Sequence, residues 1–193
     1  MPFKNNLLPR GFKAKAERIS EHLRKEIGVH VCNPLDAFVL AKHLNVIVFN
    51  IDEIGLPVNE LRHLKGLANN TVEWHALTFP INQTHVIVHN NINSPARIQS
   101  DLMHELAHII CQHHENQITT HDFPWHMRSF NPQLEAEAEY LGSCLQISKA
   151  GLFAKLKYGA TEDEIADYFL ASKQMVKYRI GQTAARKILK LNY

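Results

Sequence analysis

Residues 101–114 of the chain read DLMHELAHIICQHH and hold four of its thirteen histidines. Helical residues four apart differ by only about 40° around the axis, so His104 and His108 point to the same side, one turn apart. Two imidazoles in this arrangement can bind one zinc ion. Glu105 lies about 60° from His108 and can reach a water on the metal without binding the metal itself. Because zinc lowers the pKa of such a water to about 7, a nearby carboxylate can accept its proton.

An ordinary solvated or core helix is the alternative for these two histidines. Apolar residues dominate the same stretch, namely Leu102, Met103, Leu106, Ile109 and Ile110. A helix of this kind is expected to be buried, and buried imidazole and carboxylate groups need polar partners. A metal ion would supply one such partner, so the surroundings favour a site.

A catalytic zinc ion usually has a third protein ligand, and the segment LEAEAEY further along the chain offers three carboxylates. On a helix Glu135 and Glu139 share a face, one turn apart, whereas Glu137 points nearly opposite. The simplest assignment makes Glu135 the third ligand. Glu139 would then accept a hydrogen bond from the ring N–H of a ligand histidine, a contact that fixes ring orientation. The alternative is a charged helix face in solvent.

Together the two segments resemble the ImmA/IrrE metallopeptidases, in which a His-Glu-x-x-His helix is followed by a helix with the pattern Glu-x-x-Ala-(Asn/Asp). The segments here are MHELAHII and EAEAEYLGSCLQIS. Glu135 and Ala138 match the pattern, while Glu139 stands where the family has Asn or Asp, and LQIS stands where Leu-Met-Pro is common. The resemblance covers residues 12–150.

This resemblance implies a zincin-like domain with zinc bound by His104, His108 and Glu135, and with Glu105 as general base. It also implies the cleavage or control of transcriptional repressors. The leading hypothesis is therefore a zinc-dependent endopeptidase whose substrate is a protein or peptide such as a repressor. The alternative is a regulatory protein that binds metal through the same residues but does not cut its partner.

Further histidines follow the first motif in a stretch that reads as a loop: His113, His114, His121 and His126. Each is a spare ligand, a donor to the transition state or an ordinary polar residue. His126 is the preferred transition-state donor, because it adjoins Trp125 and lies close in sequence to the carboxylate helix. Cys111 is an alternative zinc ligand, but its apolar surroundings favour a small core residue.

The order of elements is helices, then strands, then helices, which is typical of an α+β fold. Helices are expected at 12–28, 34–44, 94–115 and 132–147, and strands at 45–51, 72–79 and 85–90. Asn33 would cap the second helix and Ser94 the third. We expect a mainly helical zincin-like domain with a small antiparallel or mixed sheet, and a substrate peptide paired with that sheet along 85–90.

The domain organisation expected is a metallopeptidase domain over 1–150 and a helical segment over 151–193 that packs on the same domain. Residues 164–180 resemble a helix-turn-helix, with Lys173, Lys177, Tyr178 and Arg179 on its second helix. Binding to DNA in the major groove is the functional interpretation. An ordinary helical hairpin ending at Gly181 is favoured, because the first helix is acidic and basic surface is scarce.

The overall composition is that of an ordinary compact protein. The 193 residues carry a net charge of +2, which gives no argument for nucleic acid or an anionic membrane. Three cysteines without a CxxC pair argue against a disulfide framework and for a reducing cytoplasm. No stretch approaches the roughly 20 apolar residues that cross a bilayer, and the N-terminus lacks the apolar core of a signal peptide. A cytoplasmic protein is therefore expected.

Overall fold

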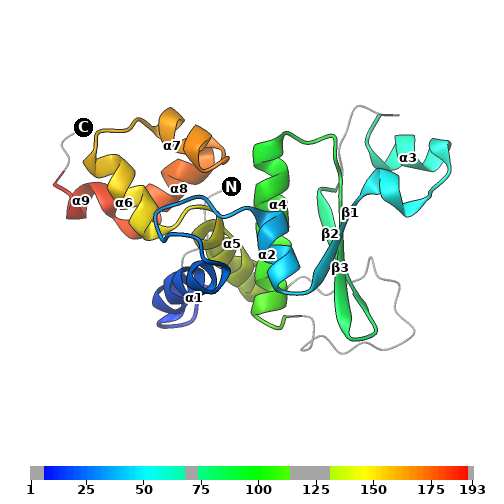
Figure 1. The fold of residues 1–193 in the computed structure, drawn as a ribbon, viewed down its shortest axis with the longest axis horizontal. Coiled ribbons are helices and arrows are strands. Elements are labelled where there is room, and N and C mark those ends of the chain that lie inside the picture. The colour runs from blue at the N-terminus through cyan, green and yellow to red at the C-terminus, as the bar shows by residue number, and fades with distance from the viewer. Residues whose placement is uncertain (1–6, 68–73, 114–130, 191–193) are drawn as a thin grey trace.

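The computed structural model describes residues 7–67, 74–113 and 131–190 (Figure 1). The helices in these ranges are α1 (Phe12–Ile27), α2 (Ala37–His43), the 3-10 helix η2 (Ile51–Ile54), α3 (Val58–Leu64), α4 (Pro95–Ile110), α5 (Pro132–Gln146), α6 (Lys149–Lys157), α7 (Glu162–Tyr168), α8 (Lys173–Thr183) and α9 (Ala185–Ile188). The strands are β1 (Val46–Asn50), β2 (Ala76–Ile81) and β3 (Thr84–His89). The predicted α+β class is confirmed. None of the described helices is long and apolar enough to cross a membrane.

The sheet is mixed, with the strand order β1-β3-β2. Strand β1 runs parallel to β3, and β2 pairs with β3 antiparallel across a turn at Asn82 and Gln83. Asn82 takes a left-handed conformation with φ 54°, which asparagine tolerates better than most residues. Because β3 has a hydrogen-bonded neighbour on each side, the prediction that a substrate pairs along 85–90 is wrong. Among the described strands, β1 and β2 form the edges of the sheet.

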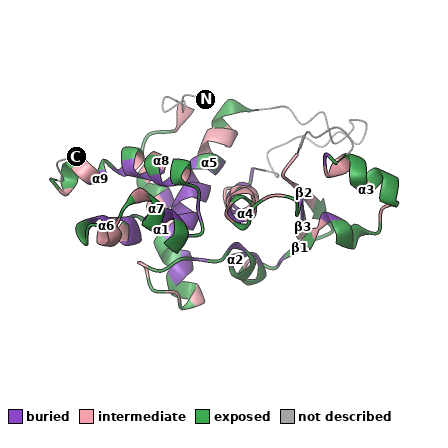
Figure 2. Cartoon of the chain, turned by 90° about the horizontal axis from the view of Figure 1, so that it is seen from above, coloured by how far each residue is buried: buried purple, intermediate pink, exposed green. Residues whose placement is uncertain are grey.

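Helix α4 is the centre of the first apolar core. Its residues Leu102, Met103 and Leu106 have no exposed surface. Figure 2 shows α4 end-on, with α5 and α1 on one side and the sheet on the other. A Cβ atom at Gly142 of α5 would lie 3.1 Å from the Met103 carbonyl oxygen and 3.2 Å from the His104 backbone nitrogen. Glycine therefore permits a close helix contact, which holds α5 beside the histidine-bearing face of α4.

The cap predicted for α4 is confirmed, whereas the cap predicted for α2 is not. As predicted, the Ser94 side chain caps α4 and accepts a hydrogen bond from the Arg97 N–H at 3.3 Å. The prediction for α2 is wrong, because Asp36 rather than Asn33 is the cap. Asp36 Oδ1 accepts the Phe38 N–H at 2.7 Å, and this side-chain contact sets the helix start at Ala37, three residues after the proline.

Helix α4 ends earlier than expected, at Ile110. Gln112 takes a left-handed conformation with φ 58°, and its N–H donates to the Ile109 carbonyl at 3.0 Å. The N–H of His113 donates to the His108 carbonyl, also at 3.0 Å. This pair of hydrogen bonds is the Schellman pattern of helix ends. It reverses the chain and brings His113 back beside His108.

A second apolar core lies among helices α6 to α9. Its members without exposed surface are Ile147, Leu152, Ile165, Val176 and Ala185. Helix α5 connects the two cores, because the first includes Leu145 and the second begins at Ile147 just beyond the helix. The predicted helix stop at Gly181 is wrong, since α8 continues to Thr183 before the chain turns.

Candidate metal centre and its cavity

Three predicted ligands converge between α4 and α5. The Nε2 atoms of His104 and His108 lie 3.1 Å apart, and Glu135 Oε2 lies 3.3 Å from the first and 3.6 Å from the second. A tetrahedral zinc ion with bonds of about 2.0–2.1 Å holds its ligand atoms about 3.3–3.4 Å apart. The three atoms therefore fit one side of such an ion. Two imidazoles and a carboxylate with a fourth position open are a ligand set of catalytic zinc.

Glu135 reaches this point because it lies in the first turn of α5. The Asn131 side chain caps that helix and accepts the Gln133 N–H at 3.0 Å. Hydrogen bonds from His104 and His108 lower the pKa of Glu135 well below its usual range, although partial burial opposes them. Burial alone would lower the pKa of His104, but the Glu135 contact and neighbouring carboxylates raise it. Glu135 is thus favoured in its ionised form beside His104.

Glu105 lies beside these ligands and lines the same cavity. The hydroxyl of Thr78, on edge strand β2, donates a hydrogen bond to Glu105 Oε2. Thr78 has no exposed surface, so this contact fixes one carboxylate oxygen from within the protein. Thr78 belongs to none of the sequence motifs that predicted the site. The signal that could have found it is an inward-facing hydroxyl in a strand whose neighbours are apolar.

A second polar group stands behind His108. His113 Nδ1 lies 2.9 Å from His108 Nδ1, and His113 Nε2 lies 3.4 Å from Glu137 Oε2. Burial, and next the charge of His108, lower the pKa of His113. The other Glu137 oxygen accepts the Gln133 side-chain N–H at 2.9 Å. The sequence placed Glu137 away from the site, but the structure connects it to His108 through His113.

Cys111 adjoins this second group without joining the first. Its sulfur lies within 4.8 Å of ligand-type atoms on His113 and Glu137. Burial raises the pKa of the Cys111 thiol to about 11, which keeps it protonated at neutral pH. Cys111 is also in contact with the first apolar core.

Two of the three proposed ligands, His104 and Glu135, border a cavity of about 510 Å³. The segment just before β2 contributes Trp74 and His75, α4 contributes Arg97 and Asp101 beside the motif, and α8 contributes Met175 and Tyr178. The cavity therefore has mixed walls, with both charges and aromatic surface. Helix α8 thus forms one side of it.

The remaining predicted site residues fall into two groups. Glu139 is exposed on α5 and lines the cavity, where its charge acts on His104. Within the described part of the chain, no hydrogen bond joins Glu139 to either ligand imidazole. His126, together with His114 and His121, lies outside the described residues.

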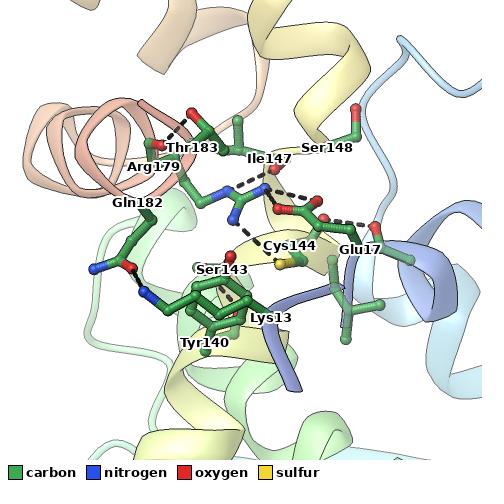
Figure 3. Close-up of polar contacts among 12 residues, drawn as sticks. Lys13, Glu17, Tyr140, Ser143, Cys144, Ile147, Ser148, Arg179, Gln182 and Thr183 are labelled. Carbon is green, nitrogen blue, oxygen red and sulfur yellow. Dashed lines mark hydrogen bonds and ion pairs between the residues drawn. The ribbon is translucent and has the colours of Figure 1, made fainter. Parts of the chain in front are cut away.

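Arg179, which the helix-turn-helix interpretation assigned to DNA, is completely buried. Figure 3 shows its guanidinium between α8, α1 and the end of α5. It donates to Glu17 at 2.8 Å, to the Ile147 carbonyl at 3.0 Å and to Cys144 Sγ at 3.2 Å. Helices α7 and α8 do form a hairpin, with Leu170 in the left-handed region at the turn (φ 47°). Arg179 therefore attaches α8 to α1 and to the end of α5 and is not part of an exposed surface of α8.

Comparison with known proteins identifies the same region. A family model described as the IrrE N-terminal-like domain, of a peptidase family, matches residues 54–181. A solved structure described as a Mycobacterium tuberculosis transcriptional regulator is similar in fold, with a TM-score of 0.56 and 16% sequence identity. The likeness covers 93% of this chain but only 49% of that one, so the chain spans about half the length of the regulator. No curated protein matches the chain.

Proposed function

This chain belongs to the peptidase family with the IrrE N-terminal-like domain, and on that premise we propose that it is a zinc-dependent endopeptidase. His104, His108 and Glu135 would hold the zinc ion, and Glu105 would act as general base. The observation that carries the proposal is the spacing of the three ligand atoms, 3.1–3.6 Å, beside a carboxylate that lines the same cavity.

The chain's own residues account for the proton transfers of peptide hydrolysis. When bound, zinc polarises the scissile carbonyl and favours attack by water. Glu105 accepts a proton from the attacking water while the water oxygen bonds to the carbonyl carbon. Glu105 then gives that proton to the leaving nitrogen as the C–N bond breaks. Thr78 holds one Glu105 oxygen in place, so the carboxylate keeps its orientation through both steps.

The substrate we propose is an extended segment of a regulatory protein. Strand β2 is an edge of the sheet and carries Thr78, so an extended peptide can pair with it next to Glu105. The aromatic and thioether side chains of Trp74, Met175 and Tyr178 line the cavity and suit an apolar substrate side chain. A transcriptional repressor is the proposed partner, a choice supported by the family and by the fold it shares with a transcriptional regulator.

The test is cleavage of a mixture of unfolded proteins of known sequence by zinc-loaded protein, with new termini mapped by mass spectrometry. The wild type should produce a reproducible set of termini. The Glu105→Gln variant should keep its zinc and lose about 100- to 10,000-fold in rate, because it lacks the general base. Equal cleavage by wild type and Glu105→Gln would refute the assignment of the base.

The same experiment separates the peptidase from a regulatory protein that binds metal without cutting. That alternative is supported if the wild type binds zinc stoichiometrically, yet neither the protein mixture nor a repressor encoded beside its gene is cleaved. DNA binding through residues 164–180 is not proposed. Lys173 pairs with Asp163 at 2.8 Å, Lys177 lies 3.8 Å from Glu162, and Arg179 is buried.

A further inference from the structure

The two ring nitrogens of His108 face different partners. Its Nε2 atom lies among the proposed ligands, while its Nδ1 atom lies 2.9 Å from Nδ1 of His113. His113 is almost fully buried, with 2% of its surface exposed. The Schellman turn after α4 places it there, because the His113 N–H is bonded to the His108 carbonyl. The contact between the rings is therefore built into the end of the helix.

The positions of the protons in this group follow from ligand chemistry. A ring nitrogen that binds a cation carries no proton, so a ligating His108 Nε2 leaves the proton on Nδ1. That proton is donated to His113 Nδ1, which must then be an acceptor. His113 consequently carries its own proton on Nε2, which faces Glu137 Oε2 at 3.4 Å. One proton therefore lies in each of the two hydrogen bonds. His108 donates to His113, and His113 donates to Glu137.

We propose that His113 and Glu137 are positioning residues that fix the tautomer and ring orientation of His108. The inference rests on the zinc site of the proposed function and adds two residues that do not touch the ion. Gln133 holds the second Glu137 oxygen at 2.9 Å, so the acceptor at the end of the chain is itself oriented. Glu139, although one turn from Glu135, makes no such contact with His108.

A second metal site is the rival explanation for the same residues. Cys111 brings a sulfur within 4.8 Å of His113 and Glu137, and the three side chains are of types that bind zinc. In that arrangement His113 Nε2 would bind an ion instead of donating to Glu137. The two explanations therefore differ in zinc stoichiometry and in the protonation of one nitrogen.

The experiment is a competition titration of zinc against a chelator on four forms of the full chain. Loss of an acceptor behind a ligand histidine typically costs about 10- to 100-fold in metal affinity. Glu137→Ala should show a loss of that size, and Glu137→Gln a smaller one, because its amide oxygen still accepts from His113. Glu139→Ala is the comparison on the same helix and should lose less zinc affinity than Glu137→Ala, because Glu139 acts on His104 through its charge and not through a hydrogen bond.

Nitrogen-15 NMR of the zinc-loaded imidazoles supplies a readout that general loosening of the fold does not change. The proposal expects protons on His108 Nδ1 and on His113 Nε2, with both persisting in Glu137→Gln. A His113 proton on Nδ1, or wild-type zinc affinity in a folded Glu137→Ala, overturns it. Two zinc ions per chain, falling to one in Cys111→Ser, establish the rival site instead. If the wild type binds no zinc, the proposed function itself fails, which is a distinguishable result.

Discussion

Helix α5 carries a polar cluster at each end, and the two clusters are built differently. At its C-terminal end, buried arginines meet the carbonyls that a helix leaves without partners. Arg24 donates to the Leu145 carbonyl at 2.7 Å, and Arg179 donates to the Ile147 carbonyl at 3.0 Å. Glu17 neutralises Arg179 at 2.8 Å. The cations also suit the negative end of the helix dipole, so donors and acceptors are matched within the protein.

At the N-terminal end, ligand-type atoms gather around a common point instead. His104 Nε2, His108 Nε2 and Glu135 Oε2 lie within 3.6 Å of one another, and His104 and Glu135 line a cavity. When both imidazoles present lone pairs there, all three atoms are acceptors, which attract a cation and repel one another. Buried polar groups alone therefore do not identify a functional site. A convergence of acceptors on an accessible cavity is the more specific sign.

The largest effect that would distinguish the two ends of α5 is expected in His104→Ala, which should change zinc binding but not the stability of the zinc-free protein. Loss of one of three ligands should abolish stoichiometric zinc binding, since even a residue behind a ligand accounts for about 10- to 100-fold. The zinc-free variant should melt close to the zinc-free wild type, because the arginine end of α5 is untouched. Elemental analysis and thermal melts in chelator test both halves. Full zinc occupancy in His104→Ala would show that the ion binds elsewhere.

The opposite result is expected for Arg179→Ala, which should lose stability but keep its zinc affinity. Removing one partner of a buried ion pair typically costs about 3–5 kcal/mol, because the remaining charge is left without compensation. Urea unfolding should show a loss of this size, with α8 released from α1 and α5. Zinc affinity measured in the folded protein should change little, since Arg179 touches no proposed ligand. A stability near that of the wild type would mean that Glu17 finds water or another cation.

The sequence was informative where the geometry is local. His104, Glu105 and His108 lie on one helix, so their spacing alone fixes their relation. Glu135 required a second helix, and its approach depends on the close contact at Gly142, which no periodicity reveals. Helical spacing favoured Glu135 among three carboxylates, and the family resemblance implied the same residue.

The positions of two other residues, His113 and Arg179, could not be predicted from the sequence. A helix continuing to residue 115 would turn His113 well away from His108, but the left-handed conformation at Gln112 brings it back. A glutamine rarely marks such a turn, which usually has glycine. Arg179 was similarly ambiguous, because a basic residue on a predicted helix reads as surface until its buried partners are known. A local turn decided the first case, and long-range partners decided the second.

The smallest effect on stability and zinc affinity is expected in Gly142→Ala, a change in α5 between its two polar clusters. Alanine gains up to about 1 kcal/mol over glycine in a helix interior. The added Cβ atom would meet α4 backbone atoms at 3.1–3.2 Å, so the helices must separate by a few tenths of an ångström. Overpacking of this kind costs about 1–3 kcal/mol, and the net change should be a destabilisation of about 0–2 kcal/mol. Zinc affinity should fall by less than in Glu137→Ala, because the ligand spacing shifts only slightly.

Gly181→Ala is the matched control, since Gly181 lies in helix α8 with no atom near its missing Cβ. It should gain the helix propensity of alanine without the clash and raise stability by up to about 1 kcal/mol. Urea unfolding of the two variants side by side isolates the packing cost at Gly142. If Gly142→Ala stabilises as much as Gly181→Ala, then α4 and α5 are not held by close contact. Glu135 would in that case owe its position to the imidazoles themselves, and zinc affinity should be insensitive to this glycine.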